Sequence, residues 1–68
     1  MKLSARNILK GRILKVDKGQ TTAHVVLDVG GLKVTSSITN EAVDDLKLRV
    51  GQTAYAVIKA SDVMVAVD

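Results

Sequence analysis

Two glycines near the middle of the chain restrict its fold more than any other feature. Gly30 and Gly31 separate residues 22–29 from residues 32–38, and in both runs apolar and polar side chains alternate. Alternation with a period of two is typical of strands, and a glycine pair between two such runs is typical of a two-residue hairpin turn. The sequence therefore predicts a β-hairpin over residues 22–38.

The turn also predicts which residues of the hairpin lie opposite each other. The mainly apolar face is expected to pair Val29 with Leu32, Leu27 with Val34, Val25 with Ser36 and Ala23 with Ile38. The other face is expected to pair Asp28 with Lys33, Val26 with Thr35 and His24 with Ser37. Because the turn and the hydrophobic pattern give the same register, we expect the hairpin to form in this register.

Three further strands and one helix are predicted around the hairpin. Residues 3–16 form a long strand whose apolar pattern changes phase after Gly11, as a β-bulge or a bend would require. A helix follows the hairpin over residues 39–48, with Thr39 as its N-cap and basic residues near its end. The last two predicted strands cover residues 53–59 and 62–67.

The composition agrees with a mostly β protein. The chain has eleven valines and neither Phe nor Trp, and Val favours strands over helices. Five strands with one short helix between strands 3 and 4 is the order of a small five-stranded Greek-key barrel of the OB type. We expect residues 1–68 to form a single domain, because so short a chain supports one core at most.

A chain of this size needs additional stabilisation. It buries only about 60% of the surface that it exposes when unfolded. The absence of cysteine excludes disulfides and thiolate metal sites, and a single histidine cannot build a zinc site. The predicted strand at residues 62–67 is apolar on both faces and needs cover on both sides. We therefore expect a homo-oligomer.

We expect no segment of these residues to direct the chain to a membrane. No apolar run approaches the length of a membrane span, and the first residues do not resemble a signal peptide. Together with the absence of cysteine, this predicts a cytoplasmic location and no membrane partner.

Two short segments near the ends of the chain combine a cation with a hydroxyl group. Ser4 and Arg6 are two residues apart, and so are Lys59 and Ser61. If the backbone is extended, residues two apart share one face, and no carboxylate lies within either pair. With a net charge of +3, this arrangement predicts a pocket for a small anion.

Four motifs spread over the whole chain carry a family resemblance. They are Ser-Ala-Arg-Asn at residues 4–7 with Leu9 and Gly11, Ser-Ile-Thr at residues 37–39, Leu48 with Gly51, and Ile-Lys-Ala-Ser at residues 58–61 with Val63. Together they resemble the molbindins, small molybdate-binding proteins whose domain also occurs in molybdate-responsive regulators and transporter ATPases. The resemblance implies an OB-like barrel, a hexamer arranged as a trimer of dimers, and oxyanion sites between subunits.

The resemblance also implies the residues of two anion sites. The principal site would use Ser4, Ala5, Arg6, Ser37, Ile38, Lys59, Ala60 and Ser61. A second site would lie around Gln20, Thr21, Thr22 and His24. Molybdate is a tetrahedral dianion that accepts hydrogen bonds and donates none, so a pocket of donors alone suits it, with no direct ligation of the metal by protein atoms.

The expected function is therefore the binding of molybdate, and by chemical likeness tungstate, for intracellular molybdenum storage or homeostasis. The main alternative is an OB-fold module for single-stranded nucleic acid, but base stacking needs aromatic side chains and Tyr55 is the only one. An enzyme is disfavoured because no set of nucleophile, base and orienting group can be assembled. Arg6, Lys59 and His24 also have the simpler interpretation of solvated surface residues.

Overall fold

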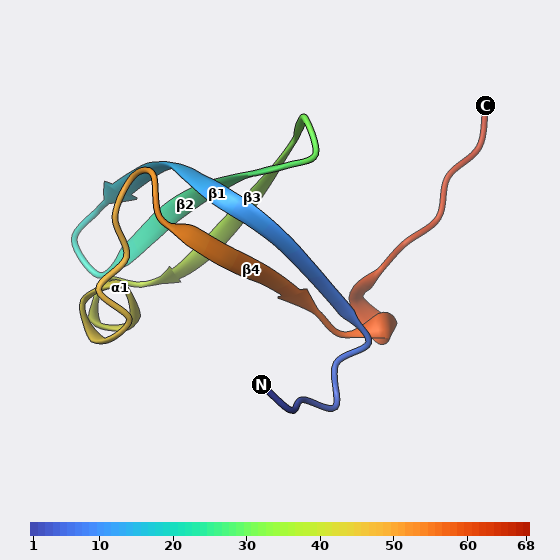
Figure 1. The fold of residues 1–68 in the computed structure, drawn as a ribbon, viewed down its shortest axis with the longest axis horizontal. Helices are drawn as coiled ribbons and strands as arrows, with labels where there is room; N and C mark the ends of the chain where they lie inside the picture. The colour runs from blue at the N-terminus through green and yellow to red at the C-terminus, as the bar shows by residue number, and fades with distance from the viewer.

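An antiparallel sheet of four strands, in the order β3-β2-β1-β4, forms the body of the protein. The computed structural model describes all residues from 1 to 68. Its elements are β1 (Asn7–Lys18), β2 (Thr22–Val29), β3 (Leu32–Thr39), α1 (Asn40–Asp45), β4 (Thr53–Ile58) and the 3₁₀ turn η1 (Ala60–Asp62). Figure 1 shows the sheet strongly twisted, with α1 at one end and both termini toward the other. A mostly β fold with one short helix between β3 and β4 is thus confirmed.

The predicted hairpin forms in the predicted register. β2 and β3 pair from Val29 opposite Leu32 through to Thr22 opposite Thr39, and every pair expected on either face is present. Gly30 and Gly31 both have positive φ, at 58° and 90°, which a two-residue hairpin turn of this type requires. The local turn chemistry and the hydrophobic pattern therefore decide this part of the fold.

β1 is long enough to pair with a different strand along each half. Its first half pairs with β4 and its second half with β2. The predicted irregularity lies at Leu14, where the register with β2 shifts between Ile13 and Lys15, three residues beyond Gly11. Gly11 itself allows close approach, because a Cβ there would lie 2.5 Å from the carbonyl oxygen of Asp28. The bulge and the glycine together curve the sheet.

The helix begins as predicted and ends earlier. Thr39 is the N-cap, and its Oγ1 accepts a hydrogen bond of 3.0 Å from the backbone N–H of Ala42. α1 stops at Asp45, so the basic residues that follow do not lie in its last turn. Just after the helix, Lys47 has a positive φ of 52°. The N–H of Leu48 donates a hydrogen bond of 3.0 Å to the carbonyl oxygen of Val43. This is the hydrogen bond of a Schellman end, usually made with glycine in the left-handed position.

The core is small and entirely aliphatic. Five residues are buried, namely Ile13, Ala23, Val25, Leu27 and Val43. They come from β1, β2 and α1, and half-buried residues such as Leu48 and Ala54 pack against them. None of the helices has the length and apolar character needed to span a membrane.

Two predictions about the ends of the chain are wrong for the protomer. The first strand starts at Asn7 and not at residue 3, because the backbone bends at Ser4 and Arg6. The expected fifth strand at residues 62–67 does not form, so the sheet has four strands and not five. After η1 this segment is exposed and has no strand beside it. A β-strand is stabilised by hydrogen bonds to a neighbouring strand, and the protomer has no strand beside this segment.

Candidate functional site

The two segments with paired cation and hydroxyl meet at one end of the sheet. β1 and β4 are antiparallel, and their last pair is Asn7 opposite Ile58. Residues 4–6 lead into Asn7 and residues 59–61 follow Ile58, so both segments leave the same strand pair. Figure 1 shows the start of β1 and the end of β4 together, away from α1. Antiparallel pairing thus brings together parts of the chain that are more than fifty residues apart.

The side-chain amide of Asn7 forms a hydrogen bond between the start of β1 and the end of β4. Asn7 donates from its Nδ2 to the carbonyl oxygen of Ile58 at 3.2 Å. This amide bonds the backbone across the strand pair, 51 residues further along the chain. Asn7 therefore holds residues 4–6 beside residues 59–61.

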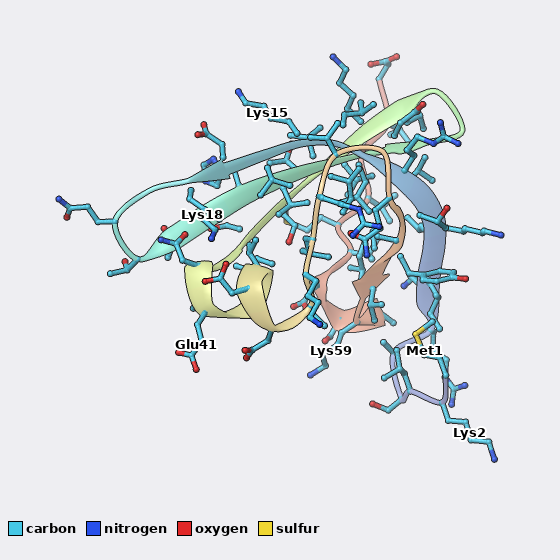
Figure 2. The ribbon with its side chains drawn as sticks, turned by 60° about the vertical axis from the view of Figure 1, so that its left-hand side comes forward. Met1, Lys2, Lys15, Lys18, Glu41 and Lys59 are labelled. Atoms are coloured by element: carbon cyan, nitrogen blue, oxygen red, sulfur yellow. The ribbon has the colours of Figure 1, made fainter.

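The cations of this cluster are not engaged elsewhere in the chain. The two ion pairs of the protein are Lys15 with Asp17 and Lys18 with Asp44, so neither Arg6 nor Lys59 is paired with a carboxylate. The hydroxyl groups of Ser4 and Ser61 also make no hydrogen bond. Figure 2 shows Lys59 extending into solvent near the end of β4. All four side chains are exposed and free to turn toward a ligand.

The backbone adds further donors at the same place. The N–H groups of Ala5, Ala60 and Ser61 have no acceptor within the chain, whereas η1 uses those of Asp62 and Val63. Exposed N–H groups beside two free cations can bind an anion with several acceptor oxygens. We call the donor groups of residues 4–6 and 59–61 the junction cluster.

Ser37 and Ile38 lie away from the junction cluster in the protomer. They belong to β3, opposite His24 and Ala23, near the end that leads into α1. They are paired strand residues and form no turn, because β3 continues its pairing with β2 to Thr39. A site that joins them to the junction cluster therefore needs two protomers. As an edge strand, β3 does present unpaired backbone groups to a neighbour.

The region of the second predicted site contains a polar hollow. It has a volume of about 210 Å³ and is lined by Asp17, Lys18, Gly19, Thr22 and His24. Thr22 and His24 are thus placed in it, whereas Gln20 and Thr21 are exposed residues of the adjoining loop and do not line it. The loop is held to α1 by Asn40, whose Nδ2 donates to the carbonyl of Gly19 at 2.9 Å.

The charges of this hollow are mixed. Asp17 contributes a carboxylate, and Lys18 already bonds Asp44 through its ammonium group. A carboxylate accepts hydrogen bonds and offers none, so it opposes an anionic ligand. Sequence reasoning missed Asp17 and Lys18, although the antiparallel pairing of β1 with β2 places them opposite His24 and Ala23.

The residues present do not form a metal-ligating group. No three side chains of the His, Cys, Asp or Glu type come together at a distance suited to a metal ion. The arrangement at the junction cluster instead offers N–H and O–H donors with positive charge. The fold and the site thus define a small, curled antiparallel β domain with unpaired cations and free hydrogen-bond donors at one end of its sheet.

Comparisons with known proteins agree with that class. Residues 3–65 match the TOBE domain family. A probable molybdenum-pterin-binding protein of Haemophilus influenzae is 49% identical over 69 residues, covering 100% of both chains. The structure of a molybdate-binding protein from Sporomusa ovata superimposes with a TM-score of 0.94 at 35% identity, covering 97% of this chain and 98% of that one.

A third match was solved with its ligand. It is the cytoplasmic molybdate-binding protein ModG with molybdate bound, at a TM-score of 0.90 and 48% identity, covering 94% of this chain and 46% of that one. The chain described here belongs to the TOBE domain family, among the small molybdenum-pterin-binding proteins or molbindins. The OB-like character expected of its fold is confirmed by these neighbours.

Proposed function

We propose that this protein binds molybdate, and by chemical likeness tungstate, at sites shared between subunits. The observation that carries the proposal is the junction cluster, where the two segments that carry two unpaired cations, two free hydroxyls and free backbone N–H groups leave the same strand pair. Support comes from relatives named for molybdenum or molybdate and from a neighbour solved with molybdate bound.

The chemistry of the ligand suits these groups. Molybdate carries two negative charges and four acceptor oxygens at neutral pH, so it needs donors only. Arg6 offers a planar fork of N–H groups, and Lys59 a compact charge that adjusts its position. Ser4 and Ser61 supply hydroxyl groups that rotate to the oxygens. Backbone N–H groups of Ala5 and Ala60 complete this half of the principal site.

The other half of the principal site is assigned to a second subunit. We place Ser37 and Ile38 there, since in one protomer they lie at the far end of the sheet from Lys59. The second site, around residues 20–24, is likewise proposed to be completed by a neighbouring chain. Because the carboxylate of Asp17 lines this hollow and opposes an anion, a partner would have to add positive charge or N–H donors for an anion to bind there.

Assembly is therefore part of the proposed function. The surface area of the protomer is 5530 Å². A compact monomer of its 7.2 kDa mass would expose about 4,100 Å². The difference supports extensive subunit contacts, and we propose a hexamer arranged as a trimer of dimers. Within it residues 1–68 act as one domain, and the assembly stores or buffers molybdate in the cytoplasm.

Two other functions fit the molecule less well. Stacking of single-stranded bases needs several aromatic side chains, and Tyr55 is the only one on the sheet. The similarity to molybdate-binding proteins supports oxyanion binding over nucleic-acid binding. The protein is a binding protein and not an enzyme, as expected for its family.

Replacing Arg6 by alanine tests the proposal. Isothermal titration of Arg6→Ala with molybdate should show most binding at the principal sites lost, because removing one partner of a bound charge costs about 2–5 kcal/mol. The subunit should stay folded, because Arg6 is exposed and forms no ion pair within the chain.

A matched control separates the site from general charge. Arg12 is also an exposed arginine but lies within β1, away from the junction. Arg12→Ala should titrate like the unmodified protein. If Arg6→Ala keeps the original affinity and stoichiometry, Arg6 is not a ligand and the junction cluster is not the site.

A further inference from the structure

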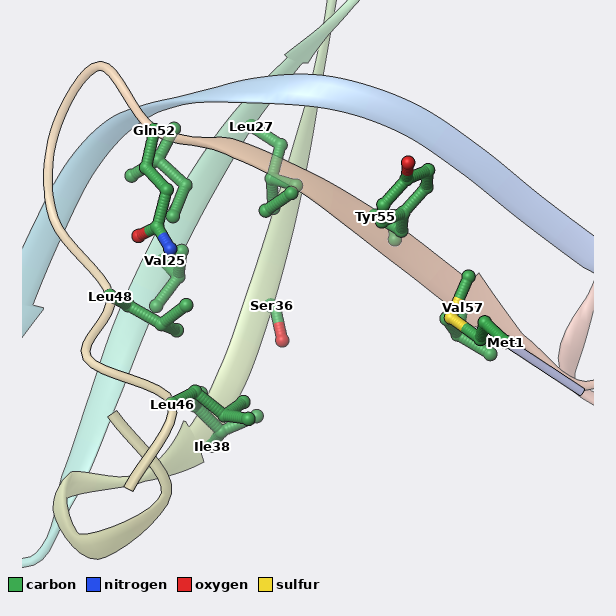
Figure 3. A pocket seen from close by; sticks show the side chains of 13 residues that line it. Met1, Val25, Leu27, Ser36, Ile38, Leu46, Leu48, Gln52, Tyr55 and Val57 are labelled. Atoms are coloured by element: carbon green, nitrogen blue, oxygen red, sulfur yellow. The ribbon is translucent and has the colours of Figure 1, made fainter. Parts of the chain in front are cut away.

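The N-terminal half of the junction cluster has few contacts that hold it in place. Residues 1–6 make no hydrogen bond with the rest of the chain. Met1 lines an apolar groove of about 370 Å³, where Figure 3 shows it beside Val57 of β4. Met1 is nevertheless 74% exposed, so this contact restrains the segment only weakly. The position of Arg6 relative to β4 therefore depends on Asn7, the first residue of β1.

The register of β1 and β4 brings two like charges toward each other at this point. The last pair of the two strands is Asn7 opposite Ile58, and one further step would place Arg6 opposite Lys59. Like charges directly opposite each other destabilise a strand pair, and neither cation is neutralised by a carboxylate. The strand pairing stops one position before the two cations. A contact at the last pair is therefore needed to keep both within reach of one anion.

The side chain of Asn7 supplies this contact. Its Nδ2 donates to the carbonyl oxygen of Ile58 at 3.2 Å, in a half-buried position. An amide forms this bond without bringing a charge to the junction. A carboxylate in its place would offer no donor to the carbonyl and would oppose an anion.

The same bond completes a row of engaged acceptors. The three consecutive carbonyl oxygens of residues 58–60 all accept hydrogen bonds within the chain. η1 engages two of them, at 2.9 and 3.2 Å, and Asn7 engages that of Ile58. The N–H groups of Ala60 and Ser61 stay free. Because carbonyl oxygens repel an anion and N–H groups attract it, engaging the carbonyls leaves a surface of donors.

We infer that Asn7 is a positioning residue of the principal anion site. Through Ile58 it holds Arg6 and Lys59 close together, against their mutual repulsion, before the anion arrives. Such preorganisation raises affinity, because binding then has less ordering to impose on the site. The inference rests on the proposed function, to which it adds a residue that acts without touching the oxyanion.

Isothermal titration with molybdate tests the effect on affinity. Asn7→Ala should raise the Kd of the principal site about two- to tenfold, the factor that one net hydrogen bond supplies, and leave the stoichiometry unchanged. Asn7→Leu, which keeps the size of the side chain and removes its donor, should show the same loss. Circular dichroism verifies that both variants are folded.

A core variant controls for a general loss of stability. Ile13→Val removes one methylene from the buried core, away from the junction, and should cost about as much stability as one hydrogen bond. It should bind molybdate with the unmodified affinity. If both Asn7 variants also bind with that affinity, the inference is wrong and the anion site stands. If the unmodified protein takes up no molybdate, the proposed function fails, and with it the role assigned to Asn7.

Urea unfolding of the anion-free protein tests the repulsion directly. At an ionic strength of about 10 mM, charges interact over about 30 Å. Lys59→Gln should raise the urea midpoint while Asn7 is present, because the two cations are then held together. In the Asn7→Ala background the strand ends can separate, so the same replacement should raise the midpoint less.

Another exposed lysine serves as the control for this measurement. Lys33 lies on β3, away from the junction, and Lys33→Gln should shift the midpoint equally in both backgrounds. A residue that only links β1 to β4 would give additive effects with Lys59→Gln. Additive effects would therefore overturn the inference without bearing on whether molybdate binds.

Discussion

Lys47 adopts a backbone conformation that a residue with a Cβ disfavours. Its φ of 52° places it in the left-handed region just after α1, in the position that helices usually give to glycine. The substitution Lys47→Gly should therefore raise the free energy of unfolding by about 0.5–1 kcal/mol. Urea unfolding followed by circular dichroism measures the change.

A second glycine substitution controls for the general effect of glycine. Lys33→Gly lies in the extended β3, where the added freedom of the unfolded chain should lower stability. If Lys47→Gly also lowers the stability, the left-handed position costs nothing and the description of the helix end is incorrect.

Single residues also show what sequence reasoning could and could not find at the site. The spacing of Ser4 with Arg6 and of Lys59 with Ser61 marks the candidate donors, because the residue types alone indicate anion chemistry. Their meeting at one strand pair depends on the antiparallel pairing of β1 with β4. The backbone around Ser4 was expected to be extended but bends at Ser4 and Arg6. No glycine or proline in this segment indicates a bend.

At the scale of elements, β1 determines the shape of the sheet through Gly11. A Cβ at this position would lie 2.5 Å from the carbonyl oxygen of Asp28 and 2.9 Å from Val29 Cγ2. Since the backbone of β2 cannot turn away as a flexible side chain can, Gly11→Ala should cost about 1–3 kcal/mol of stability. Thermal and urea unfolding of the variant measure the loss.

Gly19 is the natural comparison for Gly11. It lies in the exposed loop between β1 and β2, and a Cβ there would approach only the carbonyl of Thr22, at 3.1 Å. Gly19→Ala should therefore be the milder change. Equal stability of the two variants would mean that β1 and β2 can separate without cost at Gly11.

Elements set by local chemistry were predictable from the sequence. The β2–β3 hairpin and the N-cap of α1 depend on turn glycines, alternation and a threonine hydroxyl, all of which act over a few residues. The bulge was expected near Gly11 and lies at Leu14, because a phase change does not say which residue is left unpaired. The helix end was misplaced, since Lys47 gives no glycine signal there.

At the scale of the whole molecule, the protomer is an incomplete barrel. Only five of its 68 residues are buried, and apolar side chains remain exposed along residues 63–67. Its radius of gyration is 12.6 Å, whereas a compact chain of this length has about 11 Å. The expected fifth strand is absent because the apolar pattern of residues 62–67 does not reveal whether the same chain offers a strand to pair with, and in the protomer it offers none.

The central claim is that an oxyanion binds where β1 begins and β4 ends, close to a second subunit. Crystals grown with molybdate and measured at the molybdenum absorption edge locate the metal without reference to any assumed ligand. The account predicts an anomalous peak within hydrogen-bonding reach of Arg6 and Lys59 of one chain, with residues of a neighbouring chain completing the site. A peak elsewhere, with these two side chains free in solvent, would contradict it.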